Sequence, residues 1–271
     1  MDSIVVLILV GFLIGTVGTL IGAGGGFILV PILLLAHPEF TPETITAISM
    51  AVVASNALSG SVAYIRVRKV DYKAGLIFAL FTIPGSIIGV YATQYIPRNI
   101  FNIIFGILLI GLAIFLLFKG GKEKKANTAI QKKGWIEQTI TDKSGHIYHY
   151  SYNWRLGAAI SSAVGFISPL LGIGGGIVHV PALSEWLRFP IHIATATSHF
   201  ILAIMATVSV TVHIINGNYN DPFVLTMVIA LIAGVIPGAQ TGAYLSKILK
   251  GSFIIKALAI CLGIVGLRIL F

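Results

Sequence analysis

A glycine-rich stretch that occurs twice inside long apolar runs most constrains what this chain can fold into. The glycines of the two copies are Gly22, Gly24, Gly25 and Gly26, then Gly172, Gly174, Gly175 and Gly176. Hydrocarbon cannot satisfy exposed backbone N–H and C=O groups, so such backbone is stable at membrane depth only when protein buries it or it lines a wet cavity. We interpret the two stretches as the halves of one site.

The surrounding sequence is typical of a polytopic membrane protein. Hydrophobic residues make up 56% of the 271 residues and charged residues only 10%. A membrane-spanning helix needs about 20 apolar residues. Eight runs are close to that length or longer: 4–36, 45–65, 74–96, 99–118, 157–183, 193–215, 222–246 and 252–271. This predicts an all-α fold with seven or eight hydrophobic segments embedded in a lipid bilayer.

Charge and cysteine content exclude several classes. The net charge of +9 comes from Lys and Arg in loops beside the apolar runs, which indicates membrane orientation and no nucleic-acid partner. The single cysteine, Cys261, excludes a disulfide or a thiolate metal site within one chain. Because Asp2 replaces a basic leader and the first apolar run is long, we expect no signal peptide.

The two halves of the chain share several motifs, which indicates an internal duplication. The second glycine stretch follows the first by about 150 residues, as does a Thr-Ala-x-Ser motif at Thr46 and Thr195. A Pro-Gly-x-x-x-Gly-x-Tyr motif, expected to kink its helix, begins at Pro84 and again at Pro237. We therefore divide the chain into a first membrane repeat (1–118), a linker (119–156) and a second membrane repeat (157–271).

The loop charges predict that the repeats are inverted. Loop 66–73 has four basic residues and the linker has eight, so both are expected in the cytoplasm. The second-half counterpart of that loop, 216–221, has no basic residue, which predicts the other side of the membrane. Lys247 and Lys250 lie in the counterpart of the loop 97–99, so the charge difference is reversed there too. Inversion requires each glycine-broken helix to be re-entrant, so that only three spans cross per repeat. If both broken segments cross fully, the repeats are instead parallel.

The linker contains the only predicted β-structure. Residues 135–154 alternate between polar and apolar types around Asp142-Lys143-Ser144-Gly145, which predicts a small cytoplasmic β-hairpin. An isolated hairpin is marginally stable in water. We therefore expect it to pack on the membrane domain or on a second copy of the chain, as in a homodimer.

The glycine stretches are suited to binding an anion. Each precedes about ten apolar residues, so each is expected at a helix N-terminus, where free N–H groups carry a partial positive charge. Two such ends that meet at the membrane midplane would form a neutral site from which an anion can also leave. Close helix packing through small residues is the alternative explanation.

Polar side chains in the neighbouring helices are candidates for the same site. They are Ser49, Asn56, Ser198, His199 and, from the kinked helix of the second half, Gln240. Serines in membrane helices often bond their own backbone, which is the alternative for Ser49 and Ser198. An amide in an apolar helix needs a partner, and this favours Asn56 and Gln240.

Three histidines within the apolar segments could couple transport to protons. His179, His199 and His213 can titrate near neutral pH, although a neutral histidine bonded to a carbonyl is the alternative for each. We expect no metal site and no cofactor, because no carboxylate accompanies these histidines. No phosphate-binding loop or hydrolytic triad is present, so the sequence does not predict an enzyme.

The doubled glycine motif, followed by Val30-Pro31 and Val180-Pro181, resembles the TauE/SafE (sulfite exporter) family, as do the Thr-Ala-x-Ser and Pro-Gly motifs. The resemblance covers nearly the whole chain. It implies a secondary transporter that exports sulfite or a small organosulfonate across the cytoplasmic membrane of a prokaryote. The alternatives are a transporter of another small solute and a membrane scaffold that presents the hairpin to a partner.

Overall fold

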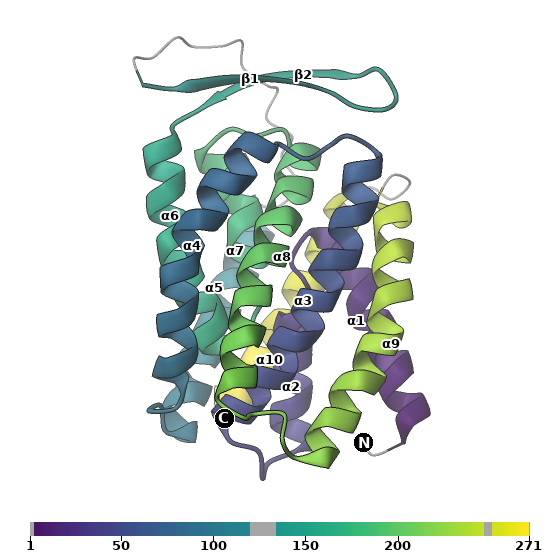
Figure 1. The fold of residues 1–271 in the computed structure, drawn as a ribbon, viewed down its shortest axis with the longest axis vertical. Coiled ribbons are helices and arrows are strands. Elements are labelled where there is room, and N and C mark those ends of the chain that lie inside the picture. Colours follow the sequence, from purple (N-terminus) through teal and green to yellow (C-terminus); the bar gives the residue numbers. More distant parts are fainter. Residues whose placement is uncertain (1–2, 120–133, 247–250, 271) are drawn as a thin grey trace.

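A computed structural model describes residues 3–119, 134–246 and 251–270. The chain forms a bundle of helices with a β-hairpin lying across one end (Figure 1). The basic stretch from 120 to 133, Lys247 and Lys250 lie outside the described residues. The helices of the first half are α1 (Ile4–Ile21), α2 (Gly26–Ala36), α3 (Pro42–Arg66), α4 (Tyr72–Thr93) and α5 (Arg98–Lys119).

The hairpin and the second half follow in the same order. The elements are β1 (Ile136–Thr141), β2 (Ile147–Tyr152), α6 (Trp154–Leu171), α7 (Gly176–Pro181), the π-helical turn η1 (Ala182–Trp186), α8 (Ile191–Ile215), α9 (Pro222–Leu245) and α10 (Gly251–Leu270). Among the described residues, 7 helices are long and apolar enough to cross a membrane: α1, α3, α4, α5, α6, α8 and α9. The predicted all-α polytopic class is confirmed.

Local sequence explains where several helices begin. Thr41 caps α3 by accepting a hydrogen bond from the Thr44 N–H at 3.2 Å, and Pro42 occupies the first turn, where its missing N–H costs nothing. Asp71 caps α4 by accepting from the Ala74 N–H at 3.0 Å. Asp221 caps α9 in the same way, through the Phe223 N–H at 2.8 Å. These caps fix the first turn of a long apolar helix at a polar loop.

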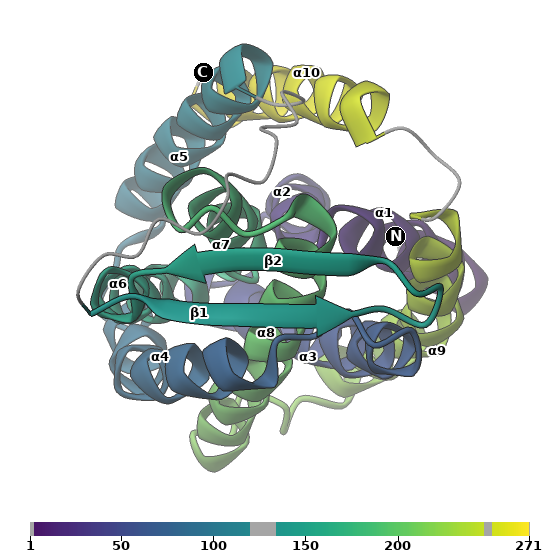
Figure 2. The same cartoon turned by 90° about the horizontal axis from the view of Figure 1, so that it is seen from above.

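The helices of the two halves are interleaved. α1 packs along α9 and α4 packs along α6, so the glycine-broken helix of each half contacts the helix with the Pro-Gly motif of the other half. α3 and α8 pack together near the centre, whereas α5 and α10 pair at one side of the bundle (Figure 2). This reciprocal pattern gives each element of the first half the same kind of partner as its counterpart in the second.

Glycines make the interleaved contacts close. A side chain at Gly238 would meet the Phe12 carbonyl of α1, and one at Gly242 would meet the Thr16 carbonyl. In the other half, a side chain at Gly85 would lie 2.8 Å from the Phe166 backbone nitrogen of α6. The glycines of the repeated Pro-Gly motif therefore let backbones touch, as small residues do between membrane helices.

Each glycine-broken segment starts and ends at the same end of the bundle. α1 starts at the end opposite the hairpin (Figure 1), and the chain after α2 is held at that end by Arg98, whose guanidinium donates to the carbonyls of Leu34 at 3.0 Å and Phe40 at 2.6 Å. α6 starts directly beneath the hairpin, and Phe189, just beyond η1, packs on the hairpin aromatics. The two segments thus enter from opposite ends.

The hairpin packs on the helical bundle. Its strands are antiparallel, with Ile136 opposite Tyr152 and Thr141 opposite Ile147. Tyr152 is fully buried, and its ring lies 4.9 Å from that of Phe189. The predicted hairpin is therefore confirmed, and its contacts are with the membrane domain, the first of the two expected partners.

A buried hydrogen bond attaches the hairpin to α4. The Tyr150 hydroxyl donates to the Asp71 carboxylate at 2.7 Å, and the Asp71 N–H donates to the Thr197 hydroxyl of α8 at 3.0 Å. Burial, and then the neighbouring Asp71 charge, raises the pKa of Tyr150, so its hydroxyl keeps the proton that it donates. Asp71 therefore connects the hairpin to both halves of the chain.

We expect Tyr150→Phe to lower the free energy of unfolding by about 1.5–3 kcal/mol, because a buried carboxylate loses a donor. Thermal unfolding of the purified protein in detergent measures the change. Tyr148→Phe is the matched control, since the Tyr148 hydroxyl lies 3.4 Å from Asp142 in a partly buried position. Equal stability of the Tyr150 variant and the control would contradict the assigned bond.

Candidate functional site

The two glycine clusters form tight turns that only glycine adopts readily. Gly22 ends α1 with φ 81°, and Gly25 caps α2 with φ 86°. In the second cluster, Gly172 and Gly174 have φ 67° and 77°. A side chain is strained in this left-handed region, which explains why the clusters break the helices where they do.

The two clusters meet in the interior of the bundle. A side chain at Gly26 would meet the Gly172 carbonyl, and one at Gly176 would meet the Gly22 carbonyl. All residues of both clusters are buried. The contact is reciprocal, so the start of each short helix lies against the end of the opposite broken helix.

The two predicted serines contact the glycine turns across the halves. The Ser49 hydroxyl of α3 donates to the Gly172 carbonyl at 2.6 Å, and the Ser198 hydroxyl of α8 donates to the Gly22 carbonyl at 3.4 Å. Both serines are fully buried. Neither bond is to the serine's own helix, so the structure places these side chains at the opposite cluster.

Asn56, Thr19 and Tyr64 form a polar group of three side chains beside the first cluster. The Asn56 amide nitrogen donates to the Gly24 carbonyl at 2.8 Å, and its amide oxygen accepts from the Thr19 hydroxyl at 2.5 Å. The Tyr64 hydroxyl donates to the Thr19 carbonyl at 2.9 Å. Thr19 and Tyr64 were missed by sequence reasoning, although Thr19 lies one turn before Gly22 and so faces the same turn.

His199 lies next to this polar group. It is fully buried, its ring centroid is 5.7 Å from that of Tyr64, and a side chain at Gly60 would lie 2.6 Å from the imidazole. Among the described residues, neither ring nitrogen makes a hydrogen bond of standard geometry. The backbone of Gly22 lies close enough to interact with the imidazole, so His199 faces the first glycine cluster. The other two candidate histidines also each have one buried ring nitrogen that lacks a hydrogen-bond partner in the described ranges.

The other predicted polar residues lie outside this group. His179 follows Gly175 by one turn and its imidazole is 3.1 Å from the Ser161 hydroxyl. His213 lies near the end of α8, 3.0 Å from the Asn218 amide oxygen. Gln240 is exposed on α9 and bonds Ser59 at 2.7 Å. Within the described part of the chain, no three His, Cys, Asp or Glu residues lie close enough to hold a metal ion.

The helix that follows the second cluster differs from the ten-residue helix expected from the sequence. α2 has 11 residues, but α7 has only 6 and continues as the π-helical turn η1. The matching Pro31 lies inside α2 without such a change, so a proline at this position does not by itself explain the π-helical turn. The two helix ends at the site are therefore related but not equivalent.

We expect Asn56→Leu to destabilise the fold, because it leaves the Gly24 carbonyl and the Thr19 hydroxyl without their partner. Each unsatisfied buried group costs about 1–3 kcal/mol. Thermal unfolding measures the loss, and Ser55→Ala is the control because the Ser55 hydroxyl bonds only its own helix, at Ala51. An Asn56 variant as stable as the control would contradict the assigned network.

Comparison with known proteins identifies the family. The family model described as sulfite exporter TauE/SafE matches residues 7–269. The probable membrane transporter protein YunE of Bacillus subtilis is 36% identical over 99% of this chain and 98% of its own length. A probable membrane transporter protein of Methanocaldococcus jannaschii is 26% identical over 97% of this chain and 94% of its own length. No solved structure matches. The chain therefore belongs to the TauE/SafE sulfite exporter family of membrane transporters.

Proposed function

We propose that the protein is a secondary transporter that exports a small sulfur-containing anion, sulfite or an organosulfonate, by alternating access around the two glycine clusters. The observation that carries the proposal is the reciprocal contact of the clusters through Gly26 with Gly172 and Gly176 with Gly22. Each cluster precedes a helix N-terminus, which supplies partial positive charge without a charged side chain.

The absence of fixed positive charge suits a site that must release its substrate. The apolar runs that contain the clusters, 4–36 and 157–183, have no Lys or Arg. Backbone dipoles bind an anion more weakly than a buried guanidinium would, and half-helix termini serve anionic substrates in other secondary transporters. A small separation of the clusters would open space for the anion between them.

The repeats are inverted in this proposal, with the hairpin end in the cytoplasm of a prokaryotic cell. α3 ends near the hairpin, where the Lys143 N–H donates to the Val67 carbonyl at 3.1 Å, whereas α8 starts there. The two helices thus run in opposite directions (Figure 1). Basic residues of loop 66–73 lie at the same end, as expected for a cytoplasmic surface.

Polar contacts link the two halves at both ends of the bundle. At the hairpin end, Asp71 bonds Thr197. At the other end, the Glu43 carboxylate accepts from the Asn218 amide at 2.7 Å, and the Tyr219 hydroxyl donates to the Ala47 carbonyl at 2.8 Å. In alternating access, one set of contacts would separate while the other remains closed.

Protons couple to export through His199 in this proposal. It lies beside the Gly22 backbone of the first cluster, and neither ring nitrogen makes a hydrogen bond of standard geometry with the residues described, so an entering proton or anion would strengthen its interactions. His179 and His213 each make one side-chain hydrogen bond and lie outside the polar group beside the first cluster. The hairpin buries its aromatic side chains on the bundle, which favours the transporter over a scaffold that presents the hairpin.

Anion flux in proteoliposomes tests the proposal. The vesicles are loaded with sulfite, thiosulfate, sulfate or sulfoacetate, each with and without a pH gradient. We expect sulfite or sulfoacetate efflux that increases with the gradient and that competing sulfur anions reduce. Folded protein that moves none of these anions would overturn the proposal and favour another small solute.

A further inference from the structure

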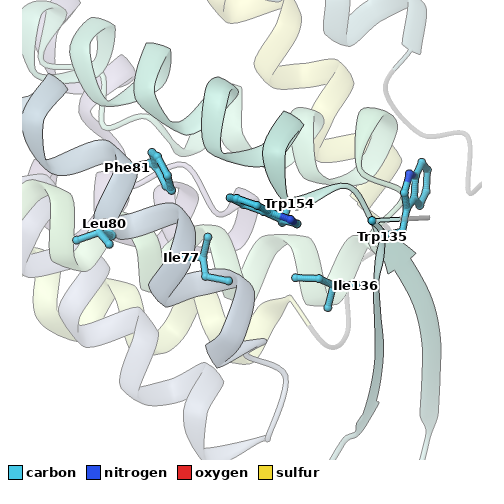
Figure 3. A pocket seen from close by; sticks show the side chains of 7 residues that line it. Ile77, Leu80, Phe81, Trp135, Ile136 and Trp154 are labelled. Carbon is cyan, nitrogen blue, oxygen red and sulfur yellow. The ribbon is translucent and has the colours of Figure 1, made fainter. Parts of the chain in front are cut away.

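An apolar groove lies between the hairpin and the outer surface of the bundle (Figure 3). Its volume of about 540 Å³ is within the range of small-molecule sites. The lining residues come from α4, the base of β1 and the start of α6: Ile77, Leu80, Phe81, Gly134, Trp135, Ile136 and Trp154. None of the seven carries a charge, so the groove itself suits hydrocarbon.

The groove runs from the membrane interface toward the interior of the bilayer. Trp135, Ile136 and Trp154 mark its hairpin end, and Leu80 and Phe81 extend along α4 away from the hairpin (Figure 3). Leu80 is 66% exposed and Phe81 40% exposed, so both are open to lipid. Tryptophan is enriched at membrane interfaces. The two indoles therefore indicate that the hairpin end of the groove lies at the membrane interface.

Positive side chains surround the same end. The Arg155 guanidinium lies 5.7 Å from the centre of the Trp154 ring, and the Arg188 guanidinium lies 5.8 Å from that of Trp135. Both arginines are exposed, as is Lys73, which lies one helical turn before Ile77 on α4. An apolar slot with cations at its interfacial end matches the two parts of an anionic phospholipid.

We propose that this groove binds one anionic phospholipid, with an acyl chain along Ile77, Leu80 and Phe81 and the phosphate beside Arg155 and Arg188. Basic residues next to a membrane attract anionic lipid headgroups. The bound lipid would contact α4 of the first half, α6 of the second half and the hairpin between them. This site is separate from the glycine clusters and does not depend on the transported substrate.

Brominated lipids test the site, because bromine quenches nearby tryptophan fluorescence. The chain has three tryptophans, and two of them line the groove. In a Trp186→Phe background, the fluorescence therefore reports the groove alone. We expect brominated phosphatidylglycerol, diluted into phosphatidylcholine vesicles, to quench more strongly than brominated phosphatidylcholine at the same fraction. Each arginine that contacts the phosphate should raise the affinity for phosphatidylglycerol relative to phosphatidylcholine about fivefold.

Charge variants distinguish a built site from general attraction to the surface. Arg155→Gln with Arg188→Gln should bring the relative affinity of the two lipids close to one. Arg66→Gln removes an exposed cation from the same end of the bundle but outside the groove, and should leave the preference unchanged. Equal quenching by both lipids in the starting protein, or an equal loss of preference in the Arg66 variant, would overturn the proposal.

Discussion

Gly176→Ala is expected to abolish anion export while the protein still inserts in the membrane. The new methyl group would clash with the Gly22 carbonyl in a close-packed interior, and it would stand between the two clusters, where the anion is proposed to bind. The φ of Gly176 is not in the left-handed region, so crowding rather than backbone strain causes the effect. Gly26→Ala places a methyl group against Gly172 and should act in the same way.

Efflux from proteoliposomes with equal amounts of inserted protein measures the loss. Gly111→Ala is the matched control, because a side chain at Gly111 of α5 meets no atom within 4 Å. We expect the control to transport like the wild type. Normal flux in Gly176→Ala and Gly26→Ala would remove the glycine contact from the mechanism.

His199→Leu is expected to remove the response of export to a pH gradient without destabilising the protein. Leucine fills a similar volume, and it removes two buried nitrogens that make no hydrogen bond of standard geometry with the described part of the chain; one such buried group costs about 1–3 kcal/mol. The melting temperature should therefore stay the same or increase. A structural histidine would give the opposite result, with lower stability and an intact response.

Flux with and without the gradient, together with thermal unfolding, separates the two outcomes. Thr211→Val is a suitable control on the same helix, because Thr211 is exposed and its hydroxyl bonds the Thr207 carbonyl of its own turn. It should leave both measurements unchanged. A His199 variant that keeps its gradient response would exclude this residue from proton coupling.

The lengths of the apolar runs and the alternation in the linker predicted most of the secondary structure. The apolar runs 45–65, 74–96 and 222–246 form α3, α4 and α9, and the alternation around Asp142 forms the hairpin. The glycine clusters broke their helices as expected, because consecutive residues at positive φ are compatible with glycine and with few other residues. These features depend on residues close together in the chain.

Features that depend on distant residues were harder to predict. The sequence identified Ser49, Ser198 and Asn56 as polar residues in apolar helices, but their partners, Gly172, Gly22 and Gly24, follow only from how the halves pack. Gln240 satisfied the same sequence criterion, yet it bonds Ser59 on an exposed surface. Polarity in a membrane helix shows that a partner is needed and does not show where it lies.

Interleaving of the halves was also beyond the sequence pattern. The Pro-Gly motifs predicted kinks, but the glycines of both motifs lie where α9 and α4 approach the backbones of α1 and α6. Close approach needs small residues in both partners, and one helix alone does not identify the other. The duplication is consistent with this packing, because each copy of the Pro-Gly motif makes the same kind of contact with the broken helix of the other half.

Equilibrium binding of radiolabelled sulfite to the protein in lipid nanodiscs tests the central claim most directly. The proposal predicts saturable binding by the wild type and by Gly111→Ala, displaced by unlabelled sulfite, and no saturable binding by Gly176→Ala or Gly26→Ala. Undiminished binding by both cluster variants would contradict a site between the glycine clusters. Absence of saturable sulfite binding by folded wild type, with sulfoacetate also failing to bind, would contradict the proposed substrate class.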